Sequence, residues 1–144
     1  MNKAPKTVIV VDGMGGGIGA QLAARIRREI KADISLLALG TNAIASQCMV
    51  EAGALRGASG ENAFRVTLAS ADFILGPVGI VLADSMMGEL SPAMAGAVLS
   101  SPARRILLPI SQSHVTIVGL AQRSVNELID EALAALATGL DGTE

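Results

Sequence analysis

Short runs of apolar residues alternate along the chain with longer segments in which apolar residues recur every three or four positions. A continuous apolar run predicts a strand that is buried on both faces, whereas the three-to-four spacing predicts a helix with one buried face. Strand and helix patterns that alternate throughout predict an α/β fold around a mainly parallel sheet. We therefore expect a Rossmann-like three-layer fold, with residues 1–144 forming a single domain.

Turn and capping residues separate these patterns. Strands are predicted at residues 7–11, 34–39, 54–58, 73–75, 105–110 and 115–120. Helices are predicted to begin near residue 18, at Thr41 or Asn42, near Ser59, at Ser91-Pro92 and at Ser124, where Ser124 and Glu127 form a capping box. Only four residues separate the last two strands, too few for a parallel crossover, so we expect an antiparallel hairpin at the C-terminal edge of the sheet. Residues 79–88 fit both a helical face and a strand, and their conformation stays open.

A glycine-rich loop follows the first predicted strand. It reads Asp12-Gly13-Met14-Gly15-Gly16-Gly17-Ile18-Gly19. Residues 15–20 satisfy the Gly-x-Gly-x-x-Ala form of the dinucleotide-binding fingerprint, and residues 13–19 are similar to the glycine motif of short-chain dehydrogenases. A loop of this kind presents backbone N–H groups and a helix N-terminus to an anion. The alternative is a tight turn between strand and helix that needs glycine but binds no ligand.

The other polar and glycine-rich segments also follow the ends of predicted strands. They cover residues 40–42, 57–62, 76–89 and 109–114. Because ligands of open parallel sheets bind beyond the carboxyl ends of the strands, we expect one crevice there. The residues expected to bind the ligand are Asp12, Gly13, Gly15, Gly16, Gly17, Ile18, Gly19, Thr41, Asn42, Glu61, Asn62, Gly76, Asp84 and Ser85.

Missing residue types narrow the ligand class. The chain has no Tyr, so the Tyr-Lys catalytic pair of short-chain dehydrogenases is excluded. Thr41 and Asn42 stand where a ribose-binding acid is expected, and the glycine loop lacks the Gly-Lys-Ser/Thr ending of a P-loop. We expect the ligand to be a nucleotide, dinucleotides included, or another phosphorylated small molecule, and a hydride-transfer enzyme is disfavoured.

Acidic residues near the loop leave an enzyme as an alternative. Asp12, together with Asp84 or Glu89, could coordinate a magnesium ion that bridges to a phosphate, or could act as an acid/base. We favour a simpler interpretation for Asp12, in which its carboxylate accepts N–H groups of its own loop. His114 is expected to lie exposed in the hairpin turn. No catalytic residue or metal ligand is assigned, and a structural module without a ligand is the third possibility.

Composition and charge bear on the other partners. The net charge is −2 with no run of like charges, and two Phe without Trp or Tyr offer little base stacking, so we expect no nucleic-acid partner. No apolar run reaches the length of a membrane span, and the N-terminal run is too short for a signal peptide. We therefore expect a cytoplasmic protein with no membrane partner. The abundant Ala and Met make a homo-oligomer the expected state.

Five segments together resemble a family of small, uncharacterised bacterial proteins that is catalogued as a domain of unknown function. The segments are residues 12–19, 40–45, 57–63, 76–85 and 88–92. They span most of the chain, and the resemblance implies a compact Rossmann-like protein. It implies no activity, ligand or catalytic residue.

Overall fold

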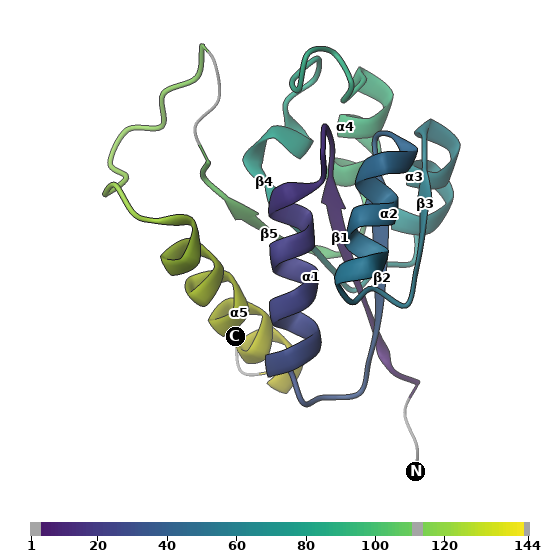
Figure 1. The fold of residues 1–144 in the computed structure, drawn as a ribbon, viewed down its shortest axis with the longest axis vertical. Coiled ribbons are helices and arrows are strands. Elements are labelled where there is room, and N and C mark those ends of the chain that lie inside the picture. The colour runs from purple at the N-terminus through teal and green to yellow at the C-terminus, as the bar shows by residue number, and fades with distance from the viewer. Residues whose placement is uncertain (1–3, 111–113, 143–144) are drawn as a thin grey trace.

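Five parallel strands form the central sheet of the computed structural model, which describes residues 4–110 and 114–142 (Figure 1). The strands are β1 (Lys6–Asp12), β2 (Ile34–Gly40), β3 (Arg56–Ser59), β4 (Phe73–Pro77) and β5 (Arg104–Leu108). Their order across the sheet is β3-β2-β1-β4-β5, which matches the first five strands of a Rossmann sheet. All four neighbouring pairs run parallel.

Helices cover both faces of the sheet. They are α1 (Gly17–Glu29), α2 (Ala43–Ala52), α3 (Glu61–Leu68), α4 (Pro92–Ser100) and α5 (Val125–Asp141). One apolar cluster joins the sheet to α1, α2 and α5, and a second joins its other face to α3 and α4. The expected three-layer α/β architecture is therefore confirmed. No helix among residues 4–110 and 114–142 is long and apolar enough to cross a bilayer.

The central strand shows why a continuous apolar run predicts a doubly covered strand. Val8 and Val10 of β1 point into the cluster with α1, and Ile9 and Val11 point into the cluster with α3 and α4. All four side chains are fully buried, because successive residues of a strand face opposite sides of the sheet. A polar side chain at any of these four positions would therefore be buried in one of the two apolar clusters.

Helix capping follows the sequence pattern at three of the predicted starts. The Asn42 side chain accepts the Ala45 N–H at 2.8 Å at the start of α2. The Ser91 hydroxyl accepts the Met94 N–H at 3.2 Å, with proline at the first position of α4. Ser124 and Glu127 form the reciprocal capping box at the start of α5. The possible cap at Ser59 is wrong, because α3 begins after Gly60 without a side-chain cap.

The predicted antiparallel edge hairpin is wrong. β5 pairs with β4 in parallel, and residues 114–124 contain no strand. Residues 109–114 were expected to form a polar turn, of which 111–113 lie outside the described residues. The apolar side chains of residues 115–120 do not enter the core, and Val118 is 91% exposed. Instead α5 covers Ile106 and Leu108 of β5, so the core at this edge is completed by a helix.

Residues 79–88 are neither a helix of normal length nor a strand. A short 3₁₀ helix, η1 (Val78–Val81), follows β4 directly. Successive turns then carry the chain over residues 82–90 to the start of α4. The sequence pattern of residues 79–88 is ambiguous because the segment consists mainly of turns, and neither a long helix nor a strand forms there.

Candidate functional site

Successive strands are added to one side of β1 up to β3 and to its other side from β4 on, so the strand order reverses between β1 and β4. After β1 the chain continues into α1 on one face, and after β4 it continues through η1 to α4 on the other face. In open α/β sheets a switch point of this kind is where ligands bind. The glycine loop, residues 12–19, follows β1 at this point, and the turn segment, residues 82–90, follows β4 and η1 (Figure 1).

Three glycines of the loop are required by packing. Gly16 has a φ of 74°, and a Cβ there would lie 2.9 Å from the backbone of Ala45 in α2. A Cβ on Gly13 would lie 2.5 Å from the Met86 sulfur. On Gly19 it would lie 2.8 Å from the Cβ of Asp12. At these three positions, the tight turn and its close packing explain the need for glycine without a ligand.

Gly15 and Gly17 are different, because nothing in the fold requires glycine there. Neither has a positive φ, and a Cβ on either would have no described heavy atom within 4 Å. Both residues are exposed, and Gly17 is the first residue of α1. The backbone at the start of α1 is therefore left bare toward solvent.

Asp12 forms the turn that the sequence favoured. Its carboxylate accepts the Gly13 N–H at 2.8 Å and the Gly19 N–H at 2.7 Å, and the residue is only 5% exposed. Burial raises the pKa of Asp12, hydrogen bonds from the backbone of Gly19, Gly13 and Ile18 oppose that rise, and the charge of Glu89 adds to it. The N-terminus of α1 is thus partly satisfied by an acid of the protein itself.

Glu89 joins three separate segments at the carboxyl edge. One oxygen of its carboxylate, Oε1, accepts the Met14 N–H at 2.9 Å, the Thr41 hydroxyl at 2.6 Å and the Asn42 amide at 2.8 Å. The Thr41 hydrogen bond is the largest of the causes that lower the pKa of Glu89. A carboxylate therefore sits among donors that belong to the glycine loop and to the loop after β2.

The segment that carries Glu89 is built from local hydrogen bonds. The Asp84 N–H donates to the Leu90 carbonyl at 2.7 Å, and the Ser85 hydroxyl donates to the Gly79 carbonyl at 2.6 Å. Leu90 is fully buried against α4, whereas Asp84 is exposed. Asp84 and Ser85 thus shape this segment, and their ligand-binding role stays a prediction.

The remaining predicted site residues lie apart from the glycine loop. Glu61 and Asn62 line a cavity of about 460 Å³ between α3 and α4, where the Asn62 side chain accepts a hydrogen bond from Arg65. Gly76 is buried in β4, and a Cβ there would lie 2.4 Å from the Val11 carbonyl oxygen. The structure therefore brings together the glycine loop, Thr41 and Asn42, but not Glu61 or Asn62.

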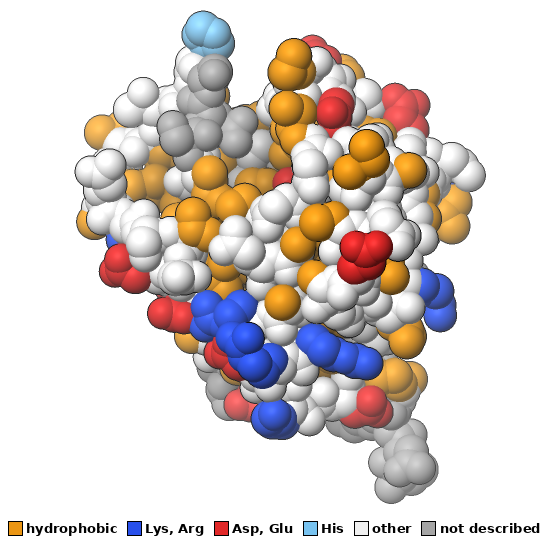
Figure 2. Space-filling view, viewed as in Figure 1, with side chains coloured by type: hydrophobic (Ala, Val, Ile, Leu, Met, Phe, Trp, Pro, Cys, Tyr) orange, Lys and Arg blue, Asp and Glu red, His pale blue; other side chains and the backbone are white. Residues whose placement is uncertain are grey.

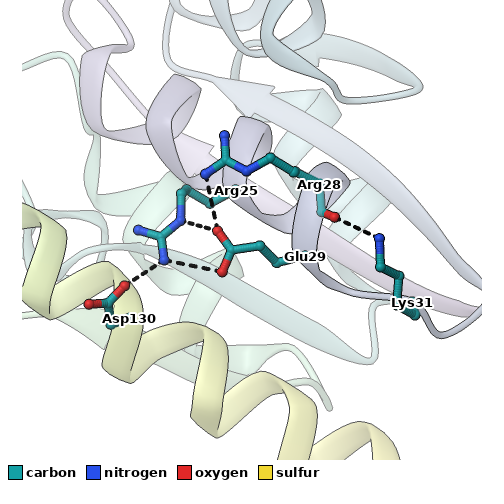
Figure 3. A network of polar contacts seen from close by, with 5 residues as sticks. All are labelled: Arg25, Arg28, Glu29, Lys31 and Asp130. Carbon is teal, nitrogen blue, oxygen red and sulfur yellow. Dashed lines mark hydrogen bonds and ion pairs between the residues drawn. The ribbon is translucent and has the colours of Figure 1, made fainter.

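Basic side chains gather at the other end of α1. In Figure 3, Arg25 pairs with Glu29 of the same helix and with Asp130 of α5, and Arg28 also contacts Glu29. In Figure 2 most of the Lys and Arg side chains visible on this face lie over its lower half, whereas α1 begins in the upper half of the same view. The Arg25–Asp130 pair connects α1 to α5, and the cluster lies at the opposite end of α1 from the glycine loop.

Metal ligation by the acids gains no support from the geometry. Within residues 4–110 and 114–142, no group of three or more His, Cys, Asp and Glu side chains is placed to hold a metal ion. In the same ranges, neither Asp12 nor Glu89 forms an ion pair with Lys or Arg. The polar partners of both acids are backbone N–H, hydroxyl and amide groups.

Sequence reasoning missed two contacts of this site. It named Glu89 as a possible acid/base or metal ligand, but not as a carboxylate bound by Thr41 and Asn42. It also missed Met86, whose sulfur lies over Gly13. Both contacts join residues more than 40 positions apart, so no local spacing could have indicated them.

No curated protein matches the chain significantly. A solved structure that it resembles is a dodecameric FMN-dependent Ubix-like decarboxylase from Escherichia coli O157:H7. The two share 15% sequence identity and a TM-score of 0.45, over 91% of this chain and 75% of that chain. A family model matches residues 7–141, and the chain belongs to that family, the domain of unknown function DUF3842.

Proposed function

We propose that this protein binds a small phosphorylated molecule, such as a nucleotide, at the carboxyl edge of β1, β2 and β4. The observation that carries the proposal is the pair Gly15 and Gly17, which the fold does not require to be glycine. A side chain at either position would stand between solvent and the first N–H groups of α1. Glycine there is explained if a ligand must approach the backbone closely.

The donors that a phosphate would use in this proposal are neutral. They are the exposed backbone N–H groups of Gly15 and Gly17, together with the Thr41 hydroxyl and the Asn42 amide at the neighbouring strand end. Asp12 holds the loop in shape by accepting the Gly13 and Gly19 N–H groups. In the proposed complex, backbone dipoles rather than Lys or Arg stabilise the phosphate charge.

Thermal unfolding with a panel of nucleotides, dinucleotides and sugar phosphates tests the proposal. Each compound is added with and without magnesium, and a ligand at a hundred times its dissociation constant stabilises the protein by about 2.7 kcal/mol. Gly17→Val should abolish the shift because its side chain covers the N-terminus of α1. Gly96→Val is the matched control, since Gly96 also has open space around it but lies in α4, beside the other cavity.

The outcomes separate the three functional classes. A shift that Gly17→Val removes and Gly96→Val keeps supports binding at the glycine loop. No shift with any compound contradicts the proposal and favours a structural module. A shift that requires magnesium and is lost in Asp12→Asn would instead favour the enzyme alternative, in which Asp12, Asp84 or Glu89 holds a metal or acts as an acid/base. Turnover of the bound compound would then identify the reaction.

A further inference from the structure

We infer that the Glu89 carboxylate occupies the anion position of the crevice and that residues 82–90 form a strap which an anionic ligand must displace. The inference rests on the proposed function, because it concerns the same donors. It adds a regulatory property, in which the protein carries its own competitor for the ligand.

The first step is the match between Glu89 and an external anion. A single oxygen, Oε1, accepts hydrogen bonds from Met14, Thr41 and Asn42, which come from two different loops. Three donors converging on one oxygen form the arrangement by which proteins bind a carboxylate or phosphate oxygen. Donors already engaged with Glu89 are not available to another anion.

The second step is electrostatic. The charge of Glu89 helps to raise the pKa of the buried Asp12, so the two acids lie close enough to repel each other. A phosphate at the same donors would add further negative charge at short range, where repulsion is strongest. Glu89 and a bound phosphate therefore exclude each other, and one must leave before the other binds.

The third step is the construction of the strap. At one end, Glu89 and the Met86 sulfur hold it against the glycine loop. Leu90, fully buried against α4, anchors it to the body of the protein. Between Met86 and Glu89, the Met87 side chain is 91% exposed, so this turn of the strap has little side-chain packing of its own.

Three residues of this segment have a backbone conformation that is unfavourable for side chains other than glycine. Asp84, Met86 and Met87 all have a positive φ, of 66°, 58° and 58°. Side chains other than glycine rarely adopt this conformation, and it persists only where the surroundings impose it. The contacts of Glu89 and Met86 with the glycine loop help to hold this backbone conformation. Their loss should therefore let the strap move away from the glycine loop.

The experiment compares the wild type with Glu89→Ala, with Glu89→Gln and with Glu51→Gln, which changes an exposed acid near the C-terminal end of α2. Binding of inorganic phosphate and of formate is measured by calorimetry, and the methyl resonances of labelled methionines report on Met86 without any ligand. Glu89→Ala should shift the Met86 resonance and bind phosphate at least about tenfold more tightly than wild type, because the donors are free in every molecule. Glu89→Gln, which keeps the acceptor oxygen but not the charge, should fall between them, and Glu51→Gln should match wild type.

The results distinguish this inference from the proposed function. If the phosphorylated compounds bind wild type and Glu89→Ala equally well, the strap inference is overturned and the binding function stands. If Glu89→Ala binds formate but no phosphorylated compound binds either protein, the anion position is supported and the proposed ligand class is wrong. An unmoved Met86 resonance in Glu89→Ala, or no anion binding by that variant, contradicts the inference directly.

Discussion

Replacing Gly16 by alanine tests whether the glycine loop combines structural and ligand-binding positions. Gly16 has a φ of 74°, where an alanine costs about 1–2 kcal/mol. The new Cβ would also lie 2.9 Å from the Cα and carbonyl oxygen of Ala45, so the backbone of α2 must shift. Overpacking of this kind costs about 1–3 kcal/mol more, which gives a total loss of about 2–5 kcal/mol. That is a large share of the roughly 5–15 kcal/mol that stabilises a typical domain.

Urea unfolding of Gly16→Ala, Gly15→Ala and Gly17→Ala measures these differences. Gly15→Ala and Gly17→Ala should leave the free energy of unfolding unchanged or raise it by up to about 1 kcal/mol, because their backbone and surroundings accept a Cβ. A lower midpoint with an unchanged slope is expected for Gly16→Ala alone. The reasoning is refuted if Gly15→Ala or Gly17→Ala loses as much stability as Gly16→Ala, since all the glycines would then be structural.

Two further predictions concern charge and self-association. Burial raises the pKa of Asp12 above 3.8, so the stability of wild type relative to Asp12→Asn should be greatest below pH 3.8 and should shrink as pH rises through the folded pKa. The pKa of Glu89 is lowered from 4.5, so the stability of wild type relative to Glu89→Gln should be present above pH 4.5 and be lost as pH falls through the folded pKa. Urea unfolding across about pH 3–7 shows whether the free energies of unfolding of the two pairs change with pH in opposite directions. The homo-oligomer stays a prediction, and the apolar side chain of Val118, which is 91% exposed, is a candidate for its interface. Val118→Asp should therefore lower the mass measured by light scattering without lowering the free energy of unfolding. An unchanged mass argues against the surface around Val118 as the interface.

The sequence alone determined most of the layered architecture, because the relevant interactions are local or periodic. The apolar run of β1 predicts a strand buried on both faces, and the structure places its side chains in two separate clusters. Ser91 and Ser124 predict the starts of α4 and α5, because a capping side chain reaches only three residues along the chain. The turn around Asp12 was predictable for the same reason, since its carboxylate bonds within its own loop.

Long-range packing determined which element covers the β5 edge of the sheet. The alternation in residues 115–120 is compatible with a strand, but α5 buries Ile106 and Leu108 of β5 instead. Whether an apolar segment becomes a strand depends on which other elements pack at the same edge of the sheet, and the local sequence does not indicate the outcome.

The same distinction applies to the candidate site. The glycine loop, Thr41 and Asn42 were predictable as a group, because the carboxyl ends of adjacent parallel strands must meet at one edge. Their contact with Glu89 was not predictable, since it spans 47 or more residues and depends on how the turns of residues 82–90 fold back over the sheet. Sequence periodicity therefore predicted which loops meet at the carboxyl edge, and long-range packing decided that donors of these loops bind the carboxylate of Glu89.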